Sequence, residues 1–489
     1  MPATGYGATS TSLEQDANSI ESINGILTLS EEDSANLKSY VRKCDFRLLL
    51  YLCIGYAADS LNKMALANAK VVGLTDDLHM KGSEINAALG VYYLGSFLSQ
   101  LPSNLVLKKV RPSYWLSGTM VCWSAVTMST ASVKTGPQLI ACRFLFGAVQ
   151  AGYLTGSLYF ISFWYPRNRV RRRMGFFFAS SGIGGIIVGP LCSGLTSAKV
   201  GNLLPWQNIF LFIGLISGVW GLLGPFILED YPDTASFLKD GERAVIRRIM
   251  EHQNTLASSK RISMHQIKLA VSDYKIWLWT TIDFCANAAT QVNGMFGPTI
   301  IASQGYTSQV SQALTALTNF MAFSGMASIA YIAKMVRGSS NAIALSNIVT
   351  ITGFILALAS PNNAGRMVAL FIFSFASPQP AAHGPAWEMA NQQGDTKPAM
   401  AAALTSAFGG LGPLATAFVY RDQDEPRFAL GHSVCLGMTM LCLLATLVLR
   451  LVLERENRRR DNSSVDLSEL TKEQIQDLAD NHPAFRYRI

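Results

Sequence analysis

The chain has 489 residues, of which 49% are hydrophobic and 15% are charged, and its formal net charge is +8. So small a charged fraction argues against a series of soluble domains, and the repeated apolar stretches of about 20 residues are long enough to cross a bilayer as helices. The basic residues lie in short runs beside those stretches, as is usual in membrane proteins, so we expect no nucleic-acid partner.

The apolar stretches form two groups of six around one hydrophilic gap. Lipid offers no partners to backbone N–H and C=O groups, so each stretch is expected to be a helix. The first group is expected to span 48–68, 85–107, 114–133, 137–160, 174–195 and 206–228. The second is expected to span 276–302, 310–333, 341–360, 366–389, 398–419 and 430–453. The sequence thus predicts an all-α membrane protein with twelve transmembrane helices in two six-helix bundles.

These spans divide the chain into five parts. We expect a disordered cytosolic N-terminal tail at 1–47, an N-terminal six-helix bundle at 48–228, a cytosolic linker at 229–275, a C-terminal six-helix bundle at 276–453 and a cytosolic C-terminal tail at 454–489. Lys and Arg gather before the first span and after the second and fourth, and the positive-inside rule places such loops in the cytosol. Both termini are therefore expected on the cytosolic side.

Catalytic and metal-binding patterns are not evident in the sequence. Most of the eight cysteines lie inside apolar spans, without the close Cys and His spacing of a zinc site. A nucleotide-driven pump would need a Gly-rich phosphate loop with Lys and Ser or Thr, which we do not find. We expect no catalytic residues, no metal, no cofactor and no enzyme activity, so energy for transport has to come from gradients.

Several runs between about Lys43 and Asp461 match one family in order. They are Asn68–Val71, Arg143–Gly147 followed by Ala151–Tyr153, Tyr231–Leu238, Gly297–Ile301 with Gly305 and Tyr306, and Trp387 with Asn391, Gly394 and Lys397. The most specific run extends from Tyr420–Asp422 through Pro426 and Arg427 to Gly431 and His432, and ends in Glu456–Asp461. Together they resemble the fungal allantoate permease (anion:cation symporter) family of the major facilitator superfamily.

The resemblance implies two helical halves around a ligand site near the bilayer midplane, a design shared by many secondary transporters. It also implies proton-coupled uptake of small organic anions and vitamins such as allantoate, nicotinate, pantothenate and biotin. Because a fold does not fix a function, the polar residues inside the spans have to be weighed separately.

In the first bundle, the chain departs from the family at two acidic positions. Residues 62–65 read Asn-Lys-Met-Ala where the family carries Asp-Arg-x-Asn. Asp59 lies one turn before Lys63, so the two are expected to pair for charge balance or proton coupling; alternatively, Lys63 snorkels to water. Arg143 suits a carboxylate substrate, with a structural bond to loop carbonyls as the alternative. Gln150 replaces an acidic residue, and its amide can bind substrate but cannot carry a proton.

In the second bundle, span 276–302 carries a polar face at helical spacing. Asp283, Asn287 and Gln291 lie four residues apart, and lipid contact would not tolerate such a face. We therefore expect all three to line a cavity, with Asp283 as a candidate for proton coupling or charge balance.

Span 366–389 supplies three further candidates. His383 lies between two prolines that break helical hydrogen bonds, so it is a candidate substrate ligand or, alternatively, a packing residue. Trp387 is expected to line the cavity, and Glu388 is expected to balance charge, couple protons or form a gate pair near the cytosolic end.

The expected function is alternating-access transport of a small organic solute, an organic anion or vitamin-like carboxylate, with proton coupling as an open question. The alternatives are an exporter of a fungal secondary metabolite and a non-transporting nutrient sensor. We expect a monomer in the plasma membrane, with an intracellular membrane as the alternative, whose partners are the small-molecule substrate and the lipid bilayer.

Overall fold

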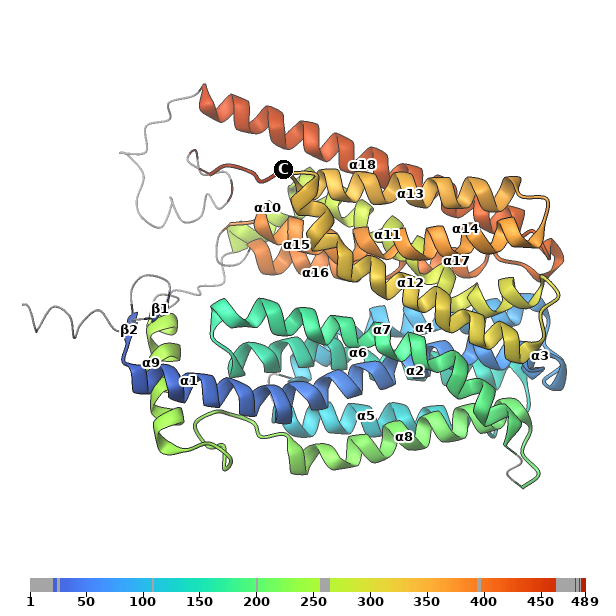
Figure 1. Cartoon of the computed structure of the whole chain (residues 1–489), viewed down its shortest axis with the longest axis horizontal. Helices are drawn as coiled ribbons and strands as arrows, with labels where there is room; N and C mark the ends of the chain where they lie inside the picture. Colours follow the sequence, from blue (N-terminus) through green and yellow to red (C-terminus); the bar gives the residue numbers. More distant parts are fainter. Residues whose placement is uncertain are drawn as a thin grey trace, which may run out of the picture.

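The structure is a computed structural model that describes residues 21–23, 27–107, 110–198, 201–255, 264–393, 397–462, 480, 483 and 485–489. Helices make up nearly all of the regular structure in these residues, and the predicted all-α fold class is confirmed. Figure 1 shows the long helices running side by side in two bundles.

The N-terminal part leads into the first bundle through a continuous helical stretch. A short antiparallel hairpin of β1 (Glu21–Ile23) and β2 (Leu27–Leu29) comes first. Then α1 (Glu31–Cys44) continues through one π-helical segment, η1 (Asp45–Leu49), into α2 (Leu50–Val71). The structure differs here from the disordered tail that we expected through residue 47.

Local signals in the sequence explain helix α1. The Ser30 hydroxyl accepts a hydrogen bond from the Asp33 backbone N–H at 3.1 Å and caps the helix. Arg42 and Lys43 lie in the last turn, where the helix dipole favours cations. The apolar face of α1 is buried against α9 (Asp240–Thr255) of the linker, and this burial stabilises the helix.

The remaining helices of the first bundle follow the expected spans closely. Between α2 and the next long helix lies the short α3 (Leu74–Asp77). The long helices are α4 (Gly82–Leu107), α5 (Pro112–Thr130), α6 (Gly136–Trp164), α7 (Arg167–Ser197) and α8 (Pro205–Ile227). The linker contributes α10 (Met264–Ser272) in addition to α9.

The second bundle contains two interrupted helices. Its elements are α11 (Tyr274–Ala302), α12 (Ser308–Met335), α13 (Ser339–Ala359), α14 (Asn363–Ala376), α15 (Pro378–Ala390), α16 (Lys397–Gly409), α17 (Gly412–Ala417), η2 (Asp422–Asp424) and α18 (Ala429–Asp461). The single spans expected at 366–389 and 398–419 are each divided in two. Pro378 lacks a backbone donor and starts a new helix at the first break, and Gly410 lies at the second.

Seven helices in the described part of the chain are long and apolar enough to cross a membrane by length and composition alone. They are Gly136–Trp164, Arg172–Ser197, Pro205–Ile227, Ser308–Met335, Ser339–Ala359, Met400–Ala417 and Ala429–Asp461. Among the other helices of the two bundles, α2 carries Asp59 and Lys63, and polar residues of this kind lower its mean hydropathy. Such residues are costly in contact with lipid, so they indicate a polar interior between the bundles.

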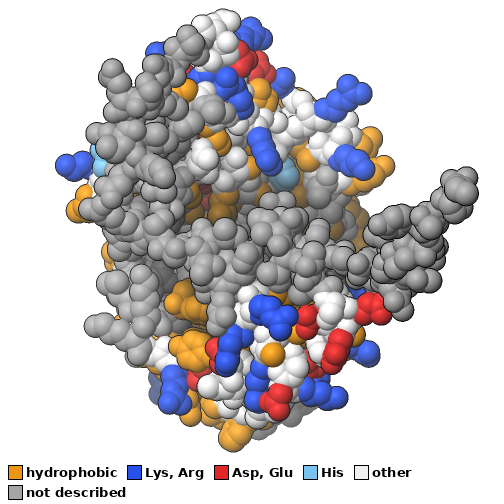
Figure 2. All heavy atoms as spheres, turned by 90° about the vertical axis from the view of Figure 1, so that its left-hand side faces the viewer, with side chains coloured by type: hydrophobic (Ala, Val, Ile, Leu, Met, Phe, Trp, Pro, Cys, Tyr) orange, Lys and Arg blue, Asp and Glu red, His pale blue; other side chains and the backbone are white. Residues whose placement is uncertain are grey.

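The two ends of the molecule differ in character. One end, which we call the terminal face, carries α1, α9, α10 and the segment Phe485–Ile489. The opposite end, which we call the loop face, carries α3 and η2 (Figure 1). Lys and Arg side chains project from both bundles on the terminal face (Figure 2). Residues 1–20, 24–26, 463–479, 481, 482 and 484 of the expected tails lie outside the described residues.

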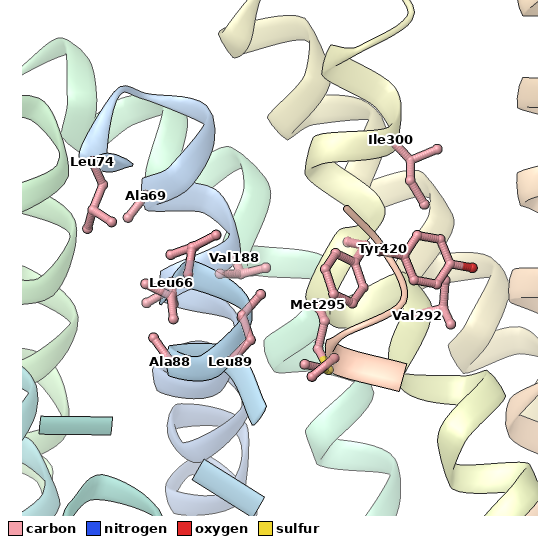
Figure 3. Packing of buried hydrophobic residues seen from close by; sticks show 14 of the residues in the cluster. Leu66, Ala69, Leu74, Ala88, Leu89, Val188, Val292, Met295, Ile300 and Tyr420 are labelled. Carbon is pink, nitrogen blue, oxygen red and sulfur yellow. The ribbon is translucent and has the colours of Figure 1, made fainter. Parts of the chain in front are cut away.

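Near the loop face, one hydrophobic cluster joins the two bundles. Figure 3 shows Leu66, Leu89 and Val188 of the first bundle facing Met295 and Tyr420 of the second. All five belong to one buried cluster, and burial of apolar surface stabilises such an interface by about 25 cal/mol per Å². The contacts between bundles run through α7 with α12, α2 with α11 and α4 with α17.

Candidate functional site

A buried ion pair lies in the middle of α2. The Lys63 ammonium is 2.6 Å from the Asp59 carboxylate, one helical turn away. The Asp59 side chain is 0% exposed, whereas that of Lys63 is 30% exposed. The carboxylate is thus enclosed by protein, while part of the lysine side chain is accessible. The ion pair that the four-residue spacing predicted is present.

Aromatic rings and an amide surround this pair. The Lys63 ammonium lies 5.8 Å from the ring centre of Tyr56 and 5.9 Å from that of Tyr92, close enough for cation–π attraction. The Tyr92 hydroxyl donates to Gln150 Oε1 at 2.7 Å, which fixes the amide of the candidate residue Gln150. These residues from α2, α4 and α6 form one connected polar group, which we call the lysine site.

The contacts of Arg143 argue against a guanidinium that is free to bind an anion. Its guanidinium donates to the Asn62 backbone carbonyl at 3.3 Å and lies 5.8 Å and 5.3 Å from the ring centres of Phe146 and Phe210. The side chain is 6% exposed, so it is packed between α2, α6 and α8. Its partner is a carbonyl within a helix rather than the loop carbonyls of the structural alternative.

In the second bundle, Asp283 is held by a neutral amide. The Asn287 amide donates to Asp283 Oδ2 at 3.0 Å and to the Asp283 carbonyl at 2.9 Å. Gly409 of α16 covers the carboxylate so closely that a Cβ there would lie 1.9 Å from Asp283 Oδ2. The absence of a side chain at Gly409 is therefore a requirement of this packing.

Glu388 lies in a separate hydrogen-bond chain. The Thr405 hydroxyl donates to Glu388 Oε1 at 2.9 Å, and the hydroxyls of Thr405 and Thr280 are 3.2 Å apart. Both Asp283 and Glu388 are buried, and the two carboxylates interact electrostatically. Among the described residues, neither has an ion-pair partner. We call Asp283, Asn287, Glu388, Thr280 and Thr405 the carboxylate site.

Gln291 lies where the two bundles meet. A Cβ at Gly294 would lie 3.4 Å from Gln291 Oε1 and 3.3 Å from the Met64 methyl group of α2. Met64 follows Lys63 directly, so Gln291 and the lysine site belong to the same region between the bundles.

A pair of amides connects α11 to the first bundle. The Asn293 amide donates to Asn319 Oδ1 at 3.0 Å, and the Asn319 amide donates to the Gly185 carbonyl of α7 at 2.7 Å. Nearer the loop face, Lys70 and Asp422 form an ion pair at 2.7 Å across the bundles. These bonds close the region between the bundles toward the loop face.

His383 and Trp387 make contacts away from this central region. The His383 imidazole Nε2 is 3.1 Å from the Ser339 hydroxyl at the start of α13. The Trp387 indole N–H donates to the backbone carbonyl of Arg488 at 2.8 Å, close to the terminal face. The structure thus places both side chains near that face, away from the lysine site.

The structure brings Asp59, Lys63 and Gln150 together in the first bundle and Asp283, Asn287 and Glu388 in the second, whereas the other candidates, Arg143, Gln291, His383 and Trp387, lie outside these two groups. It also adds Tyr92, Thr405 and Asn319, which the sequence analysis did not select. Tyr92 lies within an apolar span, where aromatic residues usually indicate packing. The hydroxyl and amide of Thr405 and Asn319 gave a weaker signal than a charge, although both are polar residues inside spans and could have been weighed on that ground.

The comparisons with known proteins agree with this architecture. A family model described as the Major Facilitator Superfamily matches residues 52–417. An uncharacterized transporter of Schizosaccharomyces pombe is 28% identical over 438 residues, which cover 88% of this chain and 89% of that one. The major facilitator-type transporter hxnP of Emericella nidulans is 26% identical over 439 residues, covering 88% of each chain.

Solved structures show the same fold at lower identity. A bacterial homolog of the human lysosomal transporter Spinster, in an inward-facing and occupied conformation, has a TM-score of 0.61 at 12% identity, covering 85% of this chain and 96% of that one. A D-xylose-proton symporter has a TM-score of 0.59 at 12% identity, covering 83% and 97%. With the match of the family model, these findings show that the chain belongs to the Major Facilitator Superfamily and is a multi-pass membrane transporter rather than an enzyme.

Proposed function

We propose that this transporter carries a small organic solute with a carboxylate group, that protons accompany the solute, and that the chain belongs to the allantoate permease branch of its superfamily. The observation that carries the proposal is the half-open ion pair at the lysine site. Lys63 is paired with Asp59, and its side chain keeps an accessible side. A substrate carboxylate can share the ammonium at this open side.

The surroundings of Lys63 support an organic anion over an inorganic one. The rings of Tyr56 and Tyr92 lie beside the ammonium and offer apolar surface to the carbon skeleton of a solute. Gln150, held by Tyr92, offers an amide for a second polar group. A mostly apolar site with a few fixed polar groups is typical of small-molecule recognition.

The carboxylate site supports proton coupling. A buried carboxylate that lacks a basic partner is costly when charged, so it holds a proton more readily than a paired one. Asp283 and Glu388 are bonded to an amide and a hydroxyl, which accommodate both the charged and the neutral form. We assign proton binding to this pair, and we assign Asp59 to charge balance because Lys63 pairs with it.

The charges of the terminal face and the closed loop face suggest how the protein is oriented in the membrane and which conformational state the structure represents. Basic residues near the terminal face favour a cytosolic location for that face, and we propose the plasma membrane as the site of action. The bonds from Asn319 to Gly185 and from Lys70 to Asp422 then close the extracellular side. We infer that the structure represents an inward-facing arrangement of the alternating-access cycle.

Purified transporter in liposomes provides the test. Uptake of labelled small carboxylates is measured beside their uncharged amide analogues, with and without an inward proton gradient. The proposal predicts saturable uptake of at least one carboxylate, no uptake of its amide, and stimulation by the gradient. Equal uptake of acid and amide would contradict carboxylate recognition. Equal uptake with and without the proton gradient would contradict proton coupling. Transport only toward the extracellular side would indicate export.

A further inference from the structure

The segment Phe485–Ile489 is bound to the terminal face of the second bundle through its backbone. Asn391 pairs with both backbone groups of Arg488: its amide donates to the Arg488 carbonyl at 2.9 Å, and the Arg488 N–H donates to Asn391 Oδ1 at 2.6 Å. The Trp387 indole N–H donates to the same carbonyl at 2.8 Å. One residue of the segment thus makes three hydrogen bonds without using its side chain.

A second asparagine repeats this arrangement one residue earlier. The Asn457 amide donates to the Tyr487 carbonyl at 2.9 Å, and the Tyr487 N–H donates to Asn457 Oδ1 at 2.9 Å. Each asparagine offers one donor and one acceptor to an extended residue, much as a neighbouring strand does when it adds to a sheet edge. Asn391 and Asn457 come from α15 and α18, so the two helices together bind one stretch of extended peptide.

The Tyr487 side chain is the anchor of the segment. It is 4% exposed, and its hydroxyl accepts from the Lys275 ammonium at 2.6 Å and donates to Asp480 Oδ2 at 2.8 Å. The cations of Lys275 and Arg460 lie 4.7 Å and 4.8 Å from its ring centre. A buried aromatic ring with a satisfied hydroxyl is the kind of contact that dominates peptide recognition.

Asp480 adds a charged contact beneath this anchor. Its carboxylate is buried and forms ion pairs with Lys397 and, at 3.3 Å, with Lys275. Burial alone would raise the pKa of Asp480, but the two lysines outweigh burial and hold its pKa below the ordinary value. Asp273 lies 2.7 Å from the Lys397 ammonium and completes an alternating cluster of two acids and two bases.

The residues that hold Asp480 and the segment Phe485–Ile489 come from four helices, at the helix ends that lie on the terminal face. Lys275 begins α11, Trp387 and Asn391 end α15, Lys397 begins α16, and Asn457 lies near the end of α18. In an alternating-access cycle these ends have to move toward the first bundle when the terminal face closes. The segment is bonded to α11, α15 and α18, and Asp480 is bonded to α16, so together they hold the four helices in one relative arrangement.

We propose that the terminal face of the second bundle is a binding site for an extended peptide, that its occupant is the chain's own Asp480 with the segment Phe485–Ile489, and that docking favours the inward-facing arrangement. The regulatory part rests on the proposed transport function and orientation, whereas the docking part does not. Backbone recognition fixes the register, and Tyr487 with Asp480 supplies selectivity. Release of the segment frees α15 and α16 and favours closure of the terminal face.

Docking is tested on a variant that lacks residues 480–489, in detergent, by fluorescence anisotropy of a labelled peptide with that sequence. We expect saturable binding and a loss of about tenfold or more in affinity when the peptide carries an N-methyl group at Arg488 or Tyr487→Ala. The matched control is Arg488→Ala, which keeps the backbone bonds and is expected to bind like the parent peptide. Absence of saturable binding, or equal binding of all these peptides, would overturn the site.

The conformational consequence is tested by the distance between spin labels at Arg172 of α7 and Met389 of α15, both exposed near the terminal face. Removal of residues 480–489 is expected to add a population with a shorter distance, and addition of the peptide is expected to reverse the shift. Identical distance distributions with and without the segment would overturn the conformational role. Because neither measurement needs a substrate, failure of the transport proposal alone leaves both results interpretable.

Discussion

The ammonium of Lys63 lies 2.6 Å from the carboxylate of Asp59, and only the lysine side chain is partly exposed. Lys63→Gln leaves a buried carboxylate without its partner, which is expected to cost about 3 kcal/mol of stability. Asp59→Asn leaves the ammonium without its partner, and the expected loss of stability is smaller because Lys63 is partly exposed. The measurement is the thermal unfolding temperature of each purified variant.

The double variant Asp59→Asn with Lys63→Gln separates stability from recognition. It removes both charges and replaces them by amides, so its unfolding temperature is expected to recover toward wild type. Substrate binding is expected to stay lost, because the ammonium is absent. Recovery of binding together with stability would show that Lys63 has only a structural role.

Gly409 is expected to tolerate no side chain. A Cβ in Gly409→Ala would lie 1.9 Å from Asp283 Oδ2, so α16 has to shift or the carboxylate has to leave its bond to Asn287. Overpacking of this kind costs about 1–3 kcal/mol. The control is Gly437→Ala, where a Cβ meets nothing within 4 Å. Transport in liposomes is expected to fall severalfold in the first variant and to remain normal in the second; equal activity would contradict the packing argument.

Gly189 is expected to control closure of the loop face. A Cβ at this position of α7 would lie 2.0 Å from the Gln312 carbonyl of α12, so Gly189→Ala has to separate the bundles there. Cysteines in place of Lys70 and Asp422, which form an ion pair across the bundles, report closure through a short bifunctional thiol reagent. We expect a clearly lower cross-linking yield.

The matched control for this experiment is Gly194→Ala in the same helix, where a Cβ meets nothing within 4 Å. Its cross-linking yield is expected to equal that of the parent protein. A normal yield in Gly189→Ala would mean that the close contact with Gln312 does not limit the approach of the bundles.

Glu242 is expected to fasten the linker to α1 in a pH-dependent way. Its carboxylate accepts from Lys43 at 2.7 Å and from the Ser39 hydroxyl at 2.6 Å. Burial would raise its pKa, but these bonds outweigh burial and lower it. A lowered pKa means that the contribution to stability is present above the unfolded pKa, roughly pH 4–5, and is lost as pH falls through the folded value.

Hydrogen exchange of the α9 amides measures this contribution. Wild-type protection, corrected for intrinsic rates, is expected to be constant above about pH 5 and to decrease below about pH 4. Glu242→Gln is expected to show reduced protection throughout and no further acid-dependent loss from this group. An identical acid profile in both proteins would contradict the role of Glu242.

The all-helical fold could be predicted from the sequence because a helix that crosses a membrane needs a long apolar stretch. Apolar length alone located the helices of both bundles, since unpaired backbone groups are excluded from lipid. The break before Pro378 was missed because the span was drawn from apolar length alone, although a proline at that position favours a helix end. Helix α1 was missed because its amphipathic face is stabilised by a partner, α9, that lies about 200 residues later in the chain.

The candidate site was predicted only where partners are close in sequence. Spacing of four residues identified the pairs Asp59 with Lys63 and Asp283 with Asn287, because one helical turn brings such residues together. The contact of Trp387 with Arg488 joins positions 101 residues apart, and no local pattern indicates it. Long-range contacts of this kind depend on how the helices pack, which a single sequence does not reveal.

The most direct measurement is proton movement driven by the substrate. Liposomes that contain the transporter and an internal pH-sensitive dye receive an external carboxylate without an imposed gradient. We predict internal acidification in wild type and its loss in Asp283→Asn, with exchange of labelled for unlabelled substrate retained. Unchanged acidification in Asp283→Asn, or substrate entry without any acidification in wild type, would contradict proton-coupled carboxylate transport through the carboxylate site.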